Sequence, residues 1–312
     1  MRTRVAVIGG GRSCEHEVSL ASAASVAGGL DPATYDVVTL TIGRDGTWRD
    51  RGGRPMSLCG AAQVLRGCDI AFPVVHGPHG EDGTLAALCD LAGLPYVGSP
   101  LGASALAMDK WATKLVAAAL GIATSAGRLV TASTAEAFPW IGPVVVKPVA
   151  AGSSLGVSLV DEPAELRPAL DAAFALDSRV LVEEVVVGRE IDVAVLRRPD
   201  GTLLVPPPLE ILGDGIFDFD AKYGGQADFR IPAPLTETET KALEDTATAM
   251  YDALGCSGVA RVDFFLTEDG PILNEVNTIP GMTEHSQVPR MFAATGLAYP
   301  DLLDQLVRGA HR

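Results

Sequence analysis

Two apolar segments near the carboxyl end of the chain are separated by a short acidic turn. The segments span residues 259–266 and 272–277, and Glu268-Asp269-Gly270 lies between them. A three-residue loop with glycine in the left-handed position is a common hairpin turn. Such a turn would pair Thr267 with Pro271, and this register decides which side chains face each other farther along the two strands.

Four polar side chains then share one face of the hairpin, because side chains alternate along a strand. The register places Asp263 opposite Glu275 and Arg261 opposite Asn277. Two facing carboxylates repel each other. A hard divalent cation such as Mg²⁺ relieves that repulsion, with Asn277 as a third oxygen ligand, and Arg261 can stabilise developing negative charge. The alternative is an acidic, solvent-facing hairpin whose charge Arg261 balances.

A lysine ends an apolar strand just before a glycine-serine turn. Residues 143–148 are apolar apart from Lys147, and Gly152-Ser153-Ser154 follows them. Backbone N–H groups and hydroxyls in such a turn can cradle phosphate oxygens. The turn is not a Walker A loop, since GxxxxGK[ST] occurs nowhere in the chain. The alternative is an ordinary hairpin whose lysine extends its ammonium into water.

A stretch rich in glycine, proline and aspartate spans residues 213–234 and contains Phe217-Asp-Phe-Asp-Ala-Lys-Tyr223. Long stretches without periodicity in compact domains are often lids over active sites. Lys222 and Tyr223 could close over a phosphate-bearing ligand and a substrate and exclude water. The alternative is a surface loop.

Three further polar or glycine-rich sites lie next to turns. Glu17 falls in the first turn of a helix, where an acidic side chain is usually favoured by the helix dipole alone. His76 follows a buried strand at the edge where α/β sheets bind ligands, although a hydrogen-bonded structural histidine is equally compatible. Gly9–Gly11 lacks the third glycine of a dinucleotide fingerprint, because Cys14 stands there.

The elements that would position these residues follow two different patterns of strands and helices along the chain. Over roughly residues 1–100, strands alternate with helices, which indicates an α/β layer with a parallel sheet. The expected strands are 5–8, 37–42, 70–75 and 95–97, and the expected helices are 18–27 and 83–92.

The rest of the chain is of α+β type and mostly antiparallel. A helix is expected over 104–120, and a hairpin over 143–148 and 155–160. Further strands are expected at 180–184, 191–195, 259–266 and 272–277, with an amphipathic helix over 237–254. Residues 197–234 show little period.

Composition limits the class of protein. The chain has 312 residues, a formal net charge of −15, and no stretch long and apolar enough for a membrane span. An acidic chain is a poor candidate for nucleic acid or an anionic membrane. The five cysteines are scattered without CxxC spacing, which favours reduced thiols in a cytoplasmic protein.

Taken together and in this order, these segments resemble the D-alanine–D-alanine ligase family of ATP-grasp enzymes. The matching pieces are GGGRSCEHEVSLASA (9–23), HGPHGEDGTLAALCDLAGLPYVGSP (76–100), ALAMDK (105–110), VVVKPVAAGSSLGVS (144–158), LVEEVVVGREIDVAV (181–195), FDFDAKY (217–223), and ARVDFFL with LNEVNTIPGMTEHSQVP (260–289). The likeness spans nearly the whole chain.

The resemblance implies a three-domain ATP-grasp ligase of α/β plus α+β class. The expected units are an N-terminal parallel-sheet domain over 1–103, a central domain over 104–186, and a C-terminal domain over 187–312 that carries the metal hairpin and the lid. The implied reaction joins two D-alanines through an acylphosphate at the expense of ATP, for peptidoglycan precursors. A cytoplasmic homodimer without nucleic-acid or membrane partners is implied as well.

The resemblance also assigns the metal and ATP contacts. Two Mg²⁺ ions, with Mn²⁺ as an alternative, would be held by Asp263, Glu275 and Asn277. The implied phosphate contacts are Lys110, Lys147 and Lys222. The implied adenine and ribose contacts are Glu183, Glu184, Val186 and Glu190.

The remaining implied roles concern the two amino acids. Glu17 would hold the ammonium of the first substrate, in a hydrogen-bonded set with Ser153 and Tyr223. The tetrahedral oxyanion would be stabilised by Arg261 and the Gly281 backbone N–H. His76 would lie near the first substrate, and Ser286 would bind the carboxylate of the second.

Two positions depart from the family pattern, and three alternatives stay open. Ala151 stands where some members have an acid, and Glu184 stands where many have lysine beside the adenine. Tyr223 favours an amine acceptor, yet a related ligase that uses D-serine, D-lactate or an unusual amino acid remains open. A non-catalytic protein with the same fold is disfavoured by the intact metal hairpin, and a Rossmann oxidoreductase would rest on Gly9–Gly11 alone.

Overall fold

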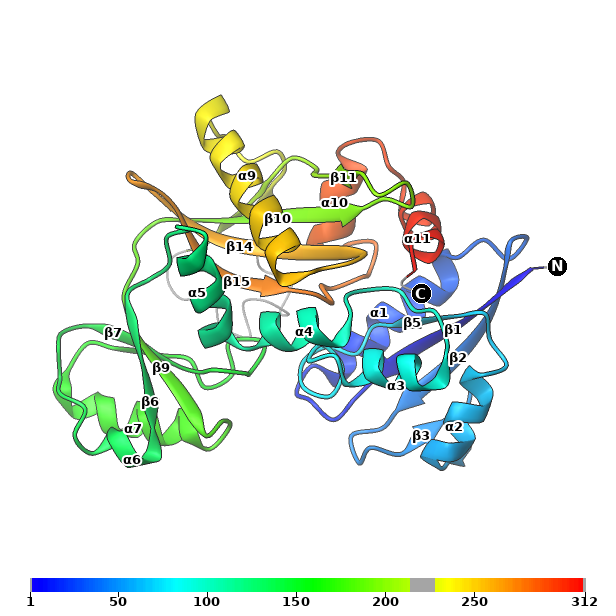
Figure 1. Cartoon of the computed structure of the whole chain (residues 1–312), viewed down its shortest axis with the longest axis horizontal. Helices are drawn as coiled ribbons and strands as arrows, with labels where there is room; N and C mark the ends of the chain where they lie inside the picture. Colours follow the sequence, from blue (N-terminus) through cyan, green and yellow to red (C-terminus); the bar gives the residue numbers. More distant parts are fainter. Residues whose placement is uncertain (1, 214–227, 311–312) are drawn as a thin grey trace.

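The computed structural model of the chain describes residues 2–213 and 228–310. Three sheets organise this part of the chain. Figure 1 shows the sheet formed within residues 127–184 as a separate lobe at the lower left, beside the other two sheets. No helix in these two ranges is long and apolar enough to cross a membrane.

The first sheet has the strand order β4-β3-β2-β1-β5. Its strands are β1 (Thr3–Gly10), β2 (Tyr35–Ile42), β3 (Trp48–Arg49), β4 (Pro55–Met56) and β5 (Ile70–Pro73), with helices α1 (His16–Gly29), α2 (Leu58–Leu65) and α3 (Thr84–Ala92). The β1 strand is parallel to β2 and β5, which confirms the predicted parallel sheet. The expected strand at 95–97 is reduced to a single parallel bridge between Tyr96 and Ala71.

Strand β1 is apolar on both faces because each face enters a different core. Val5 and Val7 pack in the cluster shared with the C-terminal helices. Ala6 and Ile8 pack on the other side of the sheet, in a cluster beneath α2 and α3. A parallel strand covered on both faces has a continuous apolar sequence rather than an alternating one.

The second sheet is antiparallel, with the order β6-β9-β7-β8. Its elements are β6 (Gly127–Thr131), β7 (Val144–Pro148), β8 (Ser158–Val160), β9 (Arg179–Glu184), α6 (Ala132–Ala135) and α7 (Pro163–Phe174). The predicted hairpin is confirmed, since Val146 pairs with Ser158 across β7 and β8. Helix α7 packs on this sheet through buried leucines and alanines.

The third sheet has the order β13-β12-β10-β14-β15, with β11 beside β10. Its strands are β10 (Arg189–Arg197), β11 (Leu203–Leu204), β12 (Leu209–Leu212), β13 (Asp228–Arg230), β14 (Val259–Thr267) and β15 (Gly270–Asn277), and its helices are α9 (Glu237–Leu254), α10 (Gln287–Ala293) and α11 (Tyr299–Arg308). Helix α9 has the predicted bounds. Strands β11 to β13 lie in the segment that showed little hydrophobic periodicity. Each has only two to four residues, which is too short to display an alternating pattern.

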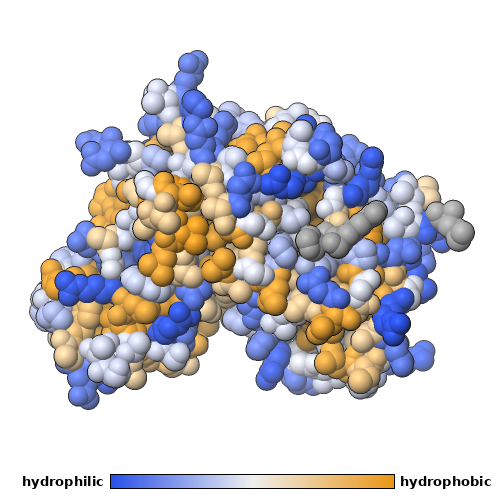
Figure 2. Space-filling model, in the orientation of Figure 1, coloured by the Kyte–Doolittle hydropathy of each residue, from blue (hydrophilic) through white to orange (hydrophobic). Residues whose placement is uncertain are grey.

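The helix expected over 104–120 is two helices, α4 (Leu101–Met108) and α5 (Lys110–Ala119). Asp109 separates them in an extended conformation, and its side chain accepts a hydrogen bond from the Ala112 N–H at 2.9 Å. Apolar residues on both sides of the stretch hid the break, and Figure 2 shows hydrophobic residues gathered over these helices. Both helices pack on the third sheet through buried alanines, while the expected domain bounds stay a prediction.

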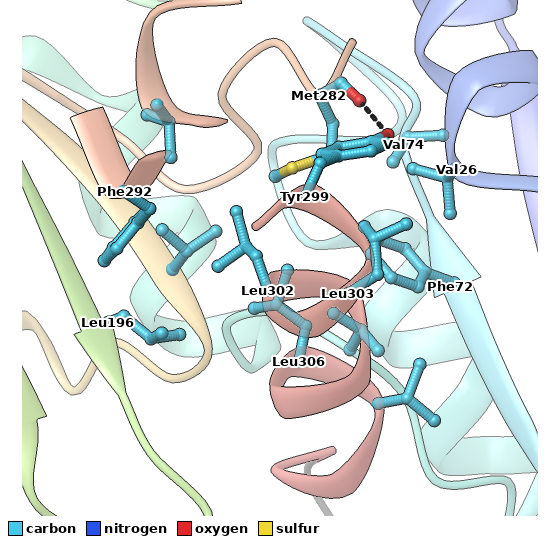
Figure 3. Close-up of a cluster of buried hydrophobic side chains, with 14 of the residues drawn as sticks. Val26, Phe72, Val74, Leu196, Met282, Phe292, Tyr299, Leu302, Leu303 and Leu306 are labelled. Atoms are coloured by element: carbon cyan, nitrogen blue, oxygen red, sulfur yellow. Dashed lines mark hydrogen bonds between the residues drawn. The ribbon is translucent and has the colours of Figure 1, made fainter. Parts of the chain in front are cut away.

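The carboxyl-terminal helix α11 joins the first and third sheets. Figure 3 shows its leucines between Phe72 of β5 and Leu196 of β10. The Tyr299 hydroxyl donates a hydrogen bond to the Met282 carbonyl at 2.7 Å, which ties the start of α11 to the loop after β15. The two sheets therefore share one core, and the loop between β15 and α10 lies at their junction.

Candidate active site

The hairpin of β14 and β15 has the predicted register at its functional end but not at its turn. The turn contains two residues, so Thr267 pairs with Gly270, and the expected pairing of Thr267 with Pro271 is wrong. A bulge at Asn274 adds one residue to β15 and restores the offset. Asp263 therefore faces Glu275, and Arg261 faces Asn277, both as predicted.

The Arg261 guanidinium is held by two aspartates and a glutamine. Its Nε and Nη2 donate to Oδ1 and Oδ2 of Asp263, each at 2.7 Å, and its Nη1 donates to Oε1 of Gln287 at 2.7 Å. Asp192 of β10 lies 3.4 Å from Nε. Burial alone would lower the pKa of Arg261, but the charges of Asp263 and Asp192 outweigh it and raise the pKa further. The cation is permanent and fixed in direction.

The three predicted metal ligands form one group of oxygen donors. Asn277 Nδ2 donates to Asp263 Oδ2 at 3.0 Å, and Glu275 lies opposite Asp263. Two carboxylates and one amide fit a hard divalent cation that completes its shell with phosphate and water. In residues 2–213 and 228–310 no three His, Cys, Asp or Glu side chains gather as a metal cluster, which agrees with a set containing only two acids.

Two of the predicted phosphate lysines reach the edge of this group. Lys110 Nζ donates to the Ala151 carbonyl at 2.8 Å and lies 3.5 Å from Glu275 Oε2. Lys147 Nζ donates to Asn274 Oδ1 at 3.3 Å and forms an ion pair of 2.6 Å with Glu183. The hairpin turn near Lys147 therefore approaches the metal hairpin from the second sheet.

The residues expected around adenine and ribose lie on β9, β10 and the loop between them. Glu183 is buried and bound by lysines, Glu184 is exposed, and Val186 is half-buried in the connecting loop. Glu190 is on β10, on the wall of the main cavity. Their contacts with a nucleotide stay a prediction.

The acid that meets Ser153 is Glu15, not Glu17. Ser153 Oγ donates to Glu15 Oε1 at 2.5 Å, so the expected hydrogen bond between Ser153 and Glu17 is wrong. Glu17 is exposed and forms an ion pair of 3.2 Å with Arg44. Gly152 allows the close approach, because a Cβ there would lie 2.6 Å from Glu15 Oε2.

Ser153 also has a strained backbone. Its φ is 52°, and that of Ser154 is 55°, in the left-handed region that residues other than glycine rarely adopt. Such strain tends to gather at functional sites, where the surrounding structure maintains it. The turn thus presents the Ser153 hydroxyl to an acid from the layer of a different sheet.

His76 is buried in a network that joins three segments. Its Nδ1 is 2.8 Å from the Ile279 carbonyl, and its Nε2 is 3.0 Å from Ser22 Oγ. Burial lowers the pKa of His76, so the ring is neutral, with Nδ1–H as donor and Nε2 as acceptor. Ser22 in turn accepts from the Met282 N–H at 3.2 Å, so His76 supports the loop that carries Gly281.

Ser286 precedes α10 and lies against Gly281. Its Oγ accepts from the Thr283 N–H at 3.1 Å and lies 2.7 Å from Thr283 Oγ1. A Cβ on Gly281 would be 3.1 Å from that hydroxyl. Gly281, whose N–H is predicted to stabilise the oxyanion, and Ser286, which is predicted to bind the second substrate, are therefore neighbours.

One cavity of about 700 Å³ brings these groups together. Its wall includes the predicted residues Glu17, His76, Ser153, Glu190, Arg261, Asp263, Glu275, Asn277, Gly281 and Ser286. Lys110 and Lys147 adjoin it through Glu275 and Asn274. Lys222, Tyr223 and most of the predicted lid over 213–234 lie outside the described residues.

Sequence reasoning missed five side chains of the site. They are Glu15, Glu81, Lys114, Asp192 and Gln287, all buried or half-buried at or beside the cavity. Burial raises the pKa of Glu81 to about 8, and the nearby charge of Glu15 adds to the shift. The sequence signal that could have found such a residue is a charged side chain inside an otherwise apolar strand, as Asp192 is.

Comparisons with known proteins match most of the chain. The family model described as D-ala D-ala ligase N-terminus matches residues 4–64 and 51–99. The model described as D-ala D-ala ligase C-terminus matches residues 127–308. The D-alanine–D-alanine ligases of Mycolicibacterium smegmatis and Nocardia farcinica are 40% and 41% identical, over 98% and 99% of this chain and 95% and 97% of theirs.

Solved structures agree with the sequence matches. The VanG D-Ala:D-Ser ligase from Enterococcus faecalis superposes with a TM-score of 0.87 at 35% identity, covering 98% of this chain and 99% of that one. The D-alanine–D-alanine ligase from Coxiella burnetii gives 0.85 at 33% identity, covering 99% and 93%.

Proposed function

The chain belongs to the D-alanine–D-alanine ligase family, and from that premise we propose how its own residues join two D-alanines. It is an ATP-dependent ligase whose product, D-alanyl-D-alanine, serves peptidoglycan synthesis. The observation that carries the proposal is the single cavity in which Glu15, Ser153, Arg261 and the Asp263–Glu275 pair meet. Each of these groups comes from a different part of the fold.

The first substrate is oriented by charge. Its ammonium binds Glu15, whose carboxylate is held by Ser153, and this replaces the sequence-based assignment to Glu17. Its carboxylate then attacks the γ-phosphorus of ATP, and ADP leaves with the electron pair of the broken bond. Lys110 and Lys147 place the phosphates, so catalysis of this step is mainly positioning and charge neutralisation.

The second step forms the peptide bond. The amine of the second D-alanine attacks the acyl carbon, loses a proton, and displaces phosphate. Negative charge grows on the acyl oxygen, which Arg261 and the Gly281 N–H stabilise in a low-dielectric cavity. Ser286 binds the carboxylate of the second D-alanine and so aims its amine at the acyl carbon.

Asp263, Glu275 and Asn277 would hold magnesium, for which their oxygens are suited. When bound, the metal supplies positive charge to the phosphate oxygens. Arg261 pairs with the charge of Asp263, and the Asn277 amide donates a hydrogen bond to it.

The family premise supports four further assignments. Lys222 and Tyr223, which lie outside the described residues, contact the ATP phosphates and the acceptor, and Glu183, Glu184, Val186 and Glu190 line the adenine and ribose site. The ligase works as a homodimer, in the cytoplasm, where ATP is supplied. The likeness to a D-Ala:D-Ser ligase keeps D-serine as the alternative acceptor.

The test is phosphate release from Mg-ATP with purified protein and D-alanine, L-alanine, D-serine or D-lactate, with the product mass recorded. We expect strong release with D-alanine and the mass of D-alanyl-D-alanine. Release only with a mixed pair would move the acceptor to D-serine or D-lactate. Silence with all four substrates would contradict the substrate assignment.

A further inference from the structure

A buried cluster of charge lies where α5 meets the second sheet. Glu183 of β9 forms an ion pair of 2.7 Å with Lys114 of α5 through Oε1, and one of 2.6 Å with Lys147 of β7 through Oε2. The side chains are 4% exposed for Glu183, 11% for Lys114 and 9% for Lys147. Two cations therefore share one carboxylate, and the cluster carries one net positive charge.

The two lysines are held very differently. Lys114 Nζ also donates to the Ser125 carbonyl at 2.7 Å and to Ser125 Oγ at 2.9 Å. Together with the ion pair to Glu183, these two hydrogen bonds place three oxygens within 2.9 Å of Lys114 Nζ, so Lys114 is firmly held. In residues 2–213 and 228–310, Lys147 has two such oxygen partners, Glu183 and Asn274 of the cavity wall.

If Lys147 moves from Glu183 to a phosphate, Glu183 keeps a countercharge because Lys114 remains paired with it. Leaving a buried carboxylate without a countercharge is strongly unfavourable, because an unpaired charge then stays in a low-dielectric interior. Burial by itself would raise the pKa of Glu183, but Lys147 and Lys114 outweigh it and hold the pKa below its usual value. The second lysine removes most of the cost of moving the first.

We propose that Lys114 is a positioning residue for ATP binding: it is the second countercharge of Glu183 and thereby releases Lys147 to the nucleotide phosphates. This inference rests on the proposed role of Lys147. It also assigns Glu183 a second task beside the adenine, namely to hold Lys147 in the cleft before ATP arrives.

A double-mutant cycle tests this exchange, with binding of magnesium and the non-hydrolysable analogue adenylyl imidodiphosphate measured by calorimetry without D-alanine. Lys114→Met should weaken binding by about tenfold or more, because Lys147 then stays on Glu183. In the Glu183→Gln background the same change should cost less than about threefold, because no buried carboxylate holds Lys147. Any contact of Glu183 with adenine cancels from this comparison.

A purely structural role of Lys114 predicts a different pattern. If Lys114 only fastens the Ser125 loop, its loss costs the same affinity in both backgrounds, and that additive result overturns the proposal. Lys114→Arg should keep affinity within about threefold, since it preserves the countercharge. Lys241→Met, which removes an exposed lysine paired with Asp245, controls for overall charge and should change nothing.

Two further outcomes keep the test decisive. If Lys114→Met does not fold, inorganic tripolyphosphate is titrated into wild type and Glu183→Gln, where tighter binding by Glu183→Gln supports the exchange and equal or weaker binding overturns it. A non-additive cycle in a protein that releases no phosphate with D-alanine would uphold this inference and reject the substrate. An additive cycle in an active D-alanine ligase would do the reverse.

Discussion

Two acids only two positions apart in sequence have opposite environments. Glu15 is buried beside Ser153, whereas Glu17 is exposed beside Arg44. Residues two apart on a helix point about 200° away from each other, because each residue turns the helix by about 100°. Glu15 precedes the first residue of α1, His16, and its buried side chain reaches Ser153, while Glu17, which also lines the cavity, is exposed and meets Arg44.

This difference predicts unequal effects of the same substitution. Glu15→Gln removes the charge that binds the first ammonium, and should raise KM for D-alanine by about tenfold to a hundredfold with little change in KM for ATP. Glu17→Gln is the matched control and should behave like wild type. Steady-state kinetics with each substrate varied checks both, and a larger defect in Glu17→Gln would restore the sequence-based assignment.

Glu81 should make stability depend on pH. Burial raises its folded-state pKa to about 8, against 4.5 for the ordinary side chain. The folded protein therefore keeps a proton that the unfolded chain releases, so this contribution is fully present below about pH 4.5 and is lost as pH rises through about 8. The Gly77 N–H donates to its Oε2 at 3.1 Å, an acceptor that glutamine retains.

Urea unfolding of metal-free protein between about pH 5 and pH 8 tests this. The unfolding free energy of wild type should fall more across that range than that of Glu81→Gln, which does not titrate. Parallel curves for the two proteins would show that Glu81 is already ionised in the folded state.

The metal hairpin gives a third prediction at this scale. Asp263→Asn retains a hydrogen-bond partner for Arg261 but loses a carboxylate ligand, so turnover should be abolished while the far-ultraviolet circular dichroism spectrum is unchanged. Manganese binding, measured by calorimetry, should weaken in parallel. Wild-type turnover in this variant would reject the assignment of Asp263 to the metal.

Among the elements, α5 connects the second and third sheets. Its body packs on α9 and β15, while its first residues reach the second sheet. Asp109 caps the helix at Ala112 and forms an ion pair of 2.6 Å with Arg179 of β9. The break between α4 and α5 therefore turns Asp109 toward Arg179 and Lys110 toward the Ala151 carbonyl.

Two substitutions separate the cap from the ion pair. Asp109→Asn keeps a good N-cap residue but loses the charge, so it should cost less than about 1 kcal/mol of unfolding free energy. Asp109→Ala loses both and should cost about 1–2 kcal/mol more than Asp109→Asn. Equal losses in urea unfolding would show that the cap contributes nothing.

At the scale of the molecule, the cavity exists only because three sheets meet around it. Helix α11 fastens the first sheet to the third, with Leu303 buried against α1 and the β1 sheet (Figure 3). Glu15 comes from the first sheet's layer, Ser153 from the second, and Arg261 from the third. Docking of the sheets is thus a condition for the site.

Loss of packing under α11 should destabilise the whole protein. Leu303→Ala creates a cavity in this core and should lower the free energy of unfolding by about 2–5 kcal/mol. The control is Leu115→Ala, since Leu115 is 54% exposed on α5 and its loss should cost less than about 0.5 kcal/mol. Chemical denaturation measures both, and equal effects would mean that the α11 contact is not part of the cooperative core.

Local pattern was enough for the features that depend on neighbouring residues. The bounds of α9 and the strand-turn-strand segments follow from periodicity and turn chemistry. The order of motifs along the chain was enough for the family. The hairpin register shows the limit, because an assumed three-residue turn and an unseen bulge at Asn274 compensated for each other.

Tertiary structure alone decided which acid faces the cavity, where α4 ends, and how Lys114, Glu183 and Lys147 share charge. These features depend on contacts between residues far apart in sequence, such as Glu15 with Ser153. Local sequence specifies the direction of a side chain from its own helix or strand, but not what other segments place there. Burial and the partner's charge, which set the final environment, arise only when the sheets dock.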